Sequence, residues 1–167
     1  METSDTLVDL SLENLLLKQV LENHNNEQLR YGFSIGELHF VYDAAIACEL
    51  VKAVTIYPVP NTPAWMLGLI NLRGALVPVF NLENYFDFKQ PLIGHNLLLI
   101  LGKGEKAVAF QLADYPILLK NLTKLSVLPK FIPKLESYVI NAYQADEIWL
   151  ELDKESFFSA LGEKVCF

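Results

Sequence analysis

Apolar and polar side chains alternate with a period of two along much of the chain after residue 30, and this alternation predicts β-strands. The pattern is clearest in residues 31–35 and 38–42, where aromatic or aliphatic residues occupy every second position. Gly36 and Glu37 separate the two runs, which predicts a hairpin with a tight turn.

Further apolar runs predict more short strands. The run at 97–101 (LLLIL) is continuous, which indicates a strand buried on both faces. Residues 44–50 fit a strand or a helical turn equally well, and residues 125–135, with two prolines, predict a loop. The other predicted strands are residues 51–56, 75–80, 106–112, 115–119, and the hairpin 137–143 with 147–152. Many short strands separated by turns are typical of an all-β barrel or sandwich.

A helical period occurs in only a few places. Leucines recur on one face of residues 12–21 after Ser11, a suitable N-cap, which predicts a helix of about three turns. A polar tract follows it, so we expect residues 1–30 to form an N-terminal helix and linker, and residues 31–167 the main domain. This helix would either pack on the domain or dock on a partner. Short helices are also predicted at 64–67, at 81–86 with Asn81 as N-cap, and at 154–161 between Asp153 and Gly162.

The composition is that of a folded domain. Hydrophobic residues make up 52% of the 167 residues, which argues against disorder. No apolar run approaches the roughly 18 residues that cross a bilayer, and the acidic N-terminus does not resemble a signal peptide. We therefore expect a cytoplasmic protein without membrane insertion. The net charge of −7 disfavours a nucleic-acid partner, because such binding relies on cations at phosphates.

Residue types that carry catalysis are sparse. The three histidines lie far apart without metal-ligand spacing, and the two cysteines, Cys48 and Cys166, make no disulfide framework. Cys48 with His39 is a conceivable nucleophile pair, and nothing in the sequence supplies its orienting acid or oxyanion donors. We therefore expect no enzymatic activity, no metal and no cofactor.

The longest apolar region, residues 54–86, holds four of the eight prolines. Arg73 is the only charged residue between positions 53 and 82, and with Gly74 it forms a predicted tight turn. This guanidinium either caps carbonyls or pairs with a carboxylate, or it is an exposed anchor for another protein, since arginine is enriched at binding hot spots. Trp65, on the proline-rich loop, is similarly a candidate either for the core or for a partner contact.

Residues 59–86 read VPNTPAWMLGLINLRGALVPVFNLENYF. This stretch resembles the signature segment of the CheW-like adaptor domain of bacterial chemosensory systems. That segment has a proline-containing loop, then Gly-hydrophobic-Ile-Asn-Leu-Arg-Gly, then hydrophobic-Val-Pro-Val and a helix start. The matching positions here are Asn71, Leu72, Arg73, Gly74, Pro78 and Val79. The likeness extends over residues 31–161.

The resemblance implies a mainly β, CheW-like fold: two SH3-like five-stranded β-barrels over a shared core, with a few short helices and an N-terminal helix. It also implies a non-enzymatic adaptor that couples methyl-accepting chemoreceptors to a CheA-type histidine kinase, in chemotaxis or in type IV pilus twitching. The barrel surface near Asn-Leu-Arg-Gly would contact the kinase and the receptor. The residues that we expect at the partner site are Arg73, Asn71, Leu72, Gly74, Val54, Ile56 and Trp65.

Two details refine this expectation. The leading extension and the sequence YGFSIG at 31–36 are more similar to PilI-type adaptors of type IV pilus systems than to flagellar adaptors. Asp114-Tyr115 stands where the family often has Asp-Gly, and because tyrosine adopts positive φ only at a cost, we expect that turn to differ. The alternative function is a module of the same fold that docks a response regulator or another kinase.

Overall fold

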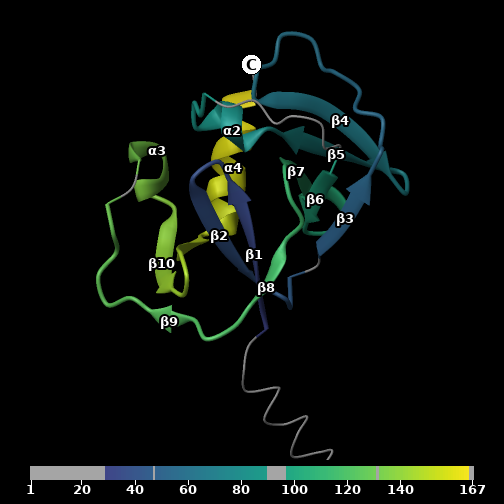
Figure 1. Cartoon of the computed structure of the whole chain (residues 1–167). Coiled ribbons are helices and arrows are strands. Elements are labelled where there is room, and N and C mark those ends of the chain that lie inside the picture. The colour runs from purple at the N-terminus through teal and green to yellow at the C-terminus, as the bar shows by residue number, and fades with distance from the viewer. Residues whose placement is uncertain (1–28, 47, 90–96, 131, 166–167) are drawn as a thin grey trace, which may run out of the picture.

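The computed structural model describes residues 29–46, 48–89, 97–130 and 132–165. These residues form two β-sheets, and helix α4 (Lys154–Val165) lies between them in the middle of the molecule (Figure 1). The prediction of a mainly β fold with a few short helices is confirmed. The helix predicted at residues 12–21 lies outside the described residues.

The first sheet has six strands in the order β8-β1-β2-β11-β10-β9. They are β1 (Arg30–Ile35), β2 (Leu38–Asp43), β8 (Ile117–Leu119), β9 (Thr123–Lys124), β10 (Val139–Gln144) and β11 (Ile148–Leu152). Both predicted hairpins are confirmed, as β1–β2 and β10–β11. The edge strands β8 and β9 follow each other directly along the chain, so the sheet curls until its edges approach, as in a small barrel.

The second sheet has five strands in the order β3-β6-β7-β5-β4. They are β3 (Cys48–Lys52), β4 (Met66–Leu72), β5 (Ala75–Phe80), β6 (Leu97–Leu101) and β7 (Val108–Leu112). Its edges are also brought together. The backbones of Tyr57, which follows β3, and Leu69 of β4 exchange two hydrogen bonds of 2.8 and 2.9 Å. The chain beyond β3 therefore lies against β4 and closes this sheet.

Three clusters of buried apolar side chains form the core of the described chain. The largest joins the two sheets to α4: Phe40 of β2, Phe110 of β7 and Phe157 of α4 are each at most 2% exposed. Two smaller clusters belong to one sheet each. One consists of Ile70, Val77, Val79, Leu98, Ile100, Ala107 and Ala109, and the other of Val41, Tyr143 and Trp149. Each sheet thus has its own interior, and the large cluster fixes the sheets to each other.

The short helices carry the predicted N-caps. Asn81 accepts a hydrogen bond of 2.9 Å from the Asn84 N–H at the start of α2 (Leu82–Tyr85). Asp153 accepts one of 3.3 Å from the Ser156 N–H at the start of α4. The predicted end of α4 at Gly162 is wrong, because the helix continues to Val165, whose side chain packs against the large core. Packing outweighs the low helix propensity of one glycine.

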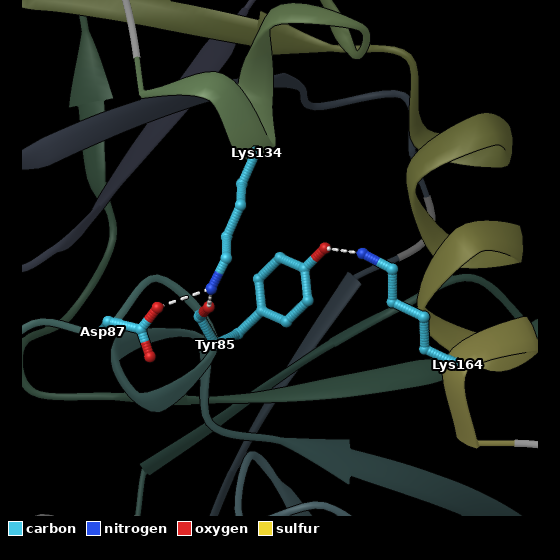
Figure 2. A network of polar contacts seen from close by, with 4 residues as sticks. All are labelled: Tyr85, Asp87, Lys134 and Lys164. Carbon is cyan, nitrogen blue, oxygen red and sulfur yellow. Dashed lines mark hydrogen bonds and ion pairs between the residues drawn. The ribbon is translucent and has the colours of Figure 1, made fainter.

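Two lysines from different helices converge on Tyr85 of α2 (Figure 2). Lys134 of α3 (Pro133–Glu136) donates to the Tyr85 carbonyl at 2.7 Å and pairs with Asp87 at 2.6 Å. Lys164 of α4 donates to the Tyr85 hydroxyl at 2.7 Å. One buried tyrosine therefore links three helices that lie far apart in the sequence.

Several predicted boundaries in the central region are wrong. The strand expected at residues 51–56 ends at Lys52, because Ala53 has a φ of 54°, which breaks the extended backbone. The ambiguous residues 44–50 contain the start of β3. The helical turn expected at 64–67 is wrong, because β4 already begins at Met66. The apolar pattern of the sequence did not distinguish this strand from the loop before it.

Two differences concern the second half of the chain. The strand expected at 106–112 begins two residues later, because Gly104–Lys106 forms a 3₁₀ turn. The loop expected at 125–135 contains the first part of α3, a single helical turn with Pro133 at its first position, where proline is well tolerated.

Candidate functional site

The β4–β5 hairpin places four of the predicted site residues at one end of the five-stranded sheet. Leu72 pairs with Ala75, so Arg73 and Gly74 form a two-residue turn. Both have positive φ, 50° and 87°, which is the pattern of a type I′ hairpin turn. Asn71 supports the turn, because its Oδ1 accepts a hydrogen bond of 2.9 Å from the Gly74 N–H.

The backbone of Arg73 has a conformation that arginine seldom adopts. Asparagine, aspartate or glycine usually fills the first position of a type I′ turn, because other side chains crowd the backbone at positive φ. Such outliers persist where the surrounding structure imposes them, and they gather at functional sites. The turn alone therefore gives no reason for an arginine, which points to a role for its side chain.

The Arg73 guanidinium makes a two-pronged ion pair with Glu49 of β3. Its two terminal nitrogens donate to the two carboxylate oxygens at 2.9 and 2.8 Å. The Arg73 side chain remains 76% exposed and that of Glu49 36%. Both sequence-based interpretations of Arg73 therefore describe part of the geometry, since it pairs with a carboxylate and also faces solvent. A pair this exposed contributes at most about 1 kcal/mol to stability.

A hollow of about 680 Å³ opens beside this ion pair, at the end of the five-stranded sheet. Arg73, Glu49 and Lys103 supply its charged lining. Its floor includes Val77 and Ile100, which belong to the interior of the same sheet. The site thus combines a fixed, solvent-facing guanidinium with an apolar depression.

Sequence reasoning missed Glu49, and it also missed two exposed leucines that are strand neighbours of residues lining the hollow. Leu76 of β5 and Leu50 of β3 are 66% and 41% exposed, although both are leucines in strands. The exposure of Leu76 could have been predicted from the sequence, because the period of two in a strand places it on the face opposite the buried Val77 and Val79. Glu49 carried no such signal, since it lies 24 positions before Arg73.

The other predicted site residues occupy different places. Val54 and Ile56 are half-buried and pack against the inner cluster of the five-stranded sheet. Trp65 precedes β4 at the end opposite Arg73, separated from it by a seven-residue strand. Its ring packs against Phe80 and Tyr85, with centroids 5.9 and 5.3 Å apart. The structure gives these three residues packing contacts, and a role for them in partner binding stays a prediction.

The residues considered for catalysis lie apart. Cys48 is exposed and belongs to the five-stranded sheet. His39 belongs to the six-stranded sheet, where its Nδ1 shares a hydrogen bond of 2.8 Å with the Ser34 hydroxyl. The described residues contain no group of three or more side chains able to hold a metal ion. Among them there is also no helix with the length and hydropathy to span a membrane.

Comparison with known proteins adds to this geometry. The CheW-like domain matches residues 31–160, which is most of the chain. The chain belongs to the CheW-like family. Proteins of this family are non-enzymatic scaffolding adaptors of chemotaxis.

Individual relatives match over shorter stretches. Protein FrzA of Myxococcus xanthus is 27% identical over 103 residues, which cover 62% of this chain and 64% of FrzA. Chemotaxis protein CheW of Treponema pallidum (strain Nichols) is 33% identical over 67 residues, which cover 40% of this chain and 39% of that protein. The chain therefore spans less than two thirds of the length of these relatives.

A solved structure supports the fold. The crystal structure of scaffolding protein TtCheW from Thermoanaerobacter tengcongensis matches with a TM-score of 0.58 at 20% identity, and the match covers 75% of this chain and 88% of that one. The predicted CheW-like fold of two SH3-like barrels is confirmed. In this CheW-like chain, one of the sheets has six strands, because the two-residue β9 adds to its edge.

Proposed function

We propose that this protein is an adaptor that couples methyl-accepting chemoreceptors to a CheA-type histidine kinase, with the Asn71–Gly74 turn as part of its partner site. Membership of the CheW-like family supports this proposal, as do relatives named chemotaxis protein CheW. The protein itself would carry out no catalysis and would hold its two partners together.

The observation that carries the proposal is the state of Arg73. Its guanidinium faces solvent, yet Glu49 already holds it in one orientation beside an apolar hollow. A side chain that is ordered before binding loses little conformational entropy when a partner docks. Arginine beside apolar surface is also the usual composition of a hot spot.

The test is binding of the purified protein to a CheA-type kinase regulatory domain and to a receptor signalling tip from the same cell, measured by calorimetry. We expect Arg73→Glu to weaken binding to at least one of them by about tenfold or more, as hot-spot substitutions do. The free energy of unfolding should change by about 1 kcal/mol or less, because the ion pair is exposed.

A charge swap separates the two roles of Arg73. The double variant combines Arg73→Glu with Glu49→Arg. Its ion pair can form again, but the guanidinium now belongs to β3 and not to the β4–β5 turn. If Arg73 contacts the partner, binding stays weak in the double variant. If the pair only stabilises the turn, binding recovers. Lys124→Glu makes the same charge change on the other sheet and should leave binding unchanged. Unchanged binding of Arg73→Glu would remove it from the site.

Finer parts of the proposal concern the pathway. We propose that the adaptor serves a type IV pilus system from the cytoplasmic side of a receptor array. We also propose that residues 1–30, apart from Arg30, which begins β1, form a unit separate from the domain at 31–167. The similarity of its leading segment to PilI-type adaptors supports this choice. Deleting the gene should then impair twitching and leave swimming intact. Binding to a response regulator or another kinase alone would favour the alternative module.

A further inference from the structure

Strand β8 leaves apolar side chains uncovered at the edge of the six-stranded sheet. It pairs with β1 on one side, and the described residues give it no strand partner on the other. Ile117 and Leu118 are 53% and 42% exposed. Successive residues of a strand point to opposite faces, so neither face of β8 is fully covered at this edge. Folded proteins normally cover or charge such an edge.

A second hollow, of about 500 Å³, is lined by β8 and by the turn between β10 and β11. All three residues of β8 line it, together with Ala145 and the Trp149 side chain. The two charged residues of its lining, Lys120 and Asp146, have opposite signs. The hollow therefore offers apolar side chains without a net charge.

The described part of the chain begins beside this hollow. Leu29 is its first residue, and Arg30 pairs with Leu119, which lines the hollow (Figure 1). The Leu29 carbonyl accepts a hydrogen bond of 2.8 Å from the Ala44 N–H, which fixes the point where the chain enters the sheet. The chain before residue 29 must therefore reach the domain next to β8.

The preceding segment contains an apolar stripe. Leu12, Leu15, Leu16 and Val20 have the spacing of one helical face. A helix of about ten residues is marginal in water by itself, so its stability depends on burying such a face. Residues 22–28 span at most about 25 Å when fully extended. The stripe is therefore confined near Leu29, at an effective concentration of about millimolar, where even a weak contact is substantially occupied.

The net charges of the two parts are complementary. Residues 1–28 contain six acidic residues and one lysine, whereas residues 115–135 contain four lysines and no acidic residue. Of these lysines, Lys120 and Lys124 have no ion pair within the described chain. Asp146 on the opposite wall reduces the positive potential at the hollow. The attraction is therefore modest, and apolar contact has to supply most of the binding free energy.

We propose that residues 12–21 dock as an amphipathic helix on the edge at β8, with the leucine stripe over Ile117, Leu118 and the hollow. The helix would cover the surface of the domain and would not enter its core. Arg73 belongs to the other sheet, so this inference can fail without affecting the proposed partner site.

The test is amide hydrogen exchange of the full chain, followed by mass spectrometry of peptides that cover residues 12–21. We expect these amides to exchange at least tenfold more slowly than those of an unstructured chain. Leu16→Asp, within the stripe, should abolish this protection. Asn14→Asp introduces the same residue on the opposite helical face and should change the exchange rate less than twofold.

Variants of the domain provide the decisive measurement, because Leu16→Asp also lowers helix propensity. Ile117→Ser and Leu118→Ser shorten exposed side chains of β8 and leave residues 12–21 unaltered. Each should speed exchange of residues 12–21 about fivefold or more, while β6 and β7 keep their wild-type rates and so report a folded domain. Val127→Ser, at a loop residue that is 77% exposed, is the matched control and should have no effect.

Three outcomes would overturn the proposal. The first is exchange of wild-type residues 12–21 at the rate of an unstructured chain, and the second is protection that both β8 variants leave unchanged. The third is protection that disappears on dilution, because the helix would then be held by a second copy of the chain.

Discussion

At the scale of single residues, Glu83 of α2 is a carboxyl that the fold buries without pairing both of its oxygens. The residue is 8% exposed, and its Oε2 has no hydrogen-bond partner within the described chain. Burial raises the pKa of Glu83, and a hydrogen bond from the Gly36 backbone opposes that rise. The folded state therefore favours the protonated acid. Stability from this group is fully present below the unfolded pKa of about 4.3 and is lost as pH rises through the folded pKa.

We therefore predict that Glu83→Gln raises the free energy of unfolding at pH 7 by on the order of 1 kcal/mol, because it removes a poorly solvated charge. The gain should shrink as pH falls toward 4, where the wild-type carboxyl is protonated. Urea unfolding between pH 4 and 8 measures it, with the exposed Glu136→Gln as control. A gain that does not depend on pH would contradict the assignment.

At the scale of elements, α3 and α4 are tied by hydrogen bonds to one residue of α2, Tyr85, through its backbone carbonyl and its hydroxyl respectively. Tyr85→Phe keeps the ring contacts with Trp65 and Phe157 and removes the acceptor of Lys164. We predict a loss of about 1 kcal/mol in the free energy of unfolding, typical of one hydrogen bond. Lys164→Met should cost a similar amount, and the double variant should cost less than the sum.

Chemical denaturation gives the free energy of unfolding of the wild type, both single variants and the double variant. The deviation from additivity is the coupling free energy, which isolates the hydrogen bond between α2 and α4. Pairing Tyr85→Phe with Lys124→Met, which removes a lysine from β9, provides the control and should give additive losses. Additive losses for Tyr85 and Lys164 would show instead that each acts through separate contacts.

At the scale of the whole molecule, the large core joins both sheets and α4, so the described chain should unfold as one unit. The two tryptophans report on different parts: Trp65 packs beside the five-stranded sheet, and Trp149 lies inside the six-stranded one. We predict that the variants Trp65→Phe and Trp149→Phe each show fluorescence and circular dichroism transitions at the same urea concentration.

The fluorescence midpoint of each variant is compared with the circular dichroism midpoint of the same variant. A change in overall stability therefore does not affect the result. The wild type, with both tryptophans, serves as the reference for cooperativity. Two separated transitions in either variant would mean that the sheets unfold independently, and that the large core does not couple them.

Much of the architecture follows from local sequence. Alternation with a period of two predicted the β1–β2 and β10–β11 hairpins, because their pairing partners are close along the chain. Asn81 and Asp153 were recognisable as N-caps for the same reason: each bonds to a backbone N–H three residues later. The boundaries of β3 and β4 were not recognisable. The positive φ of Ala53, which ends β3, has no signal in the sequence, and prolines and continuous apolar residues hide the alternation before β4.

The candidate site divides in the same way. The Asn71–Gly74 turn and its lone arginine could be predicted without the fold, since they depend on adjacent residues. The fold is what brings Arg73 to Glu49 and sets β11 parallel to β2. It also places phenylalanines from both sheets and α4 around one cavity. Gly32 is a further case, because a Cβ there would overlap the Trp149 ring. Such contacts join residues far apart along the chain, and they depend on how the sheets curl and pack, which no local pattern specifies.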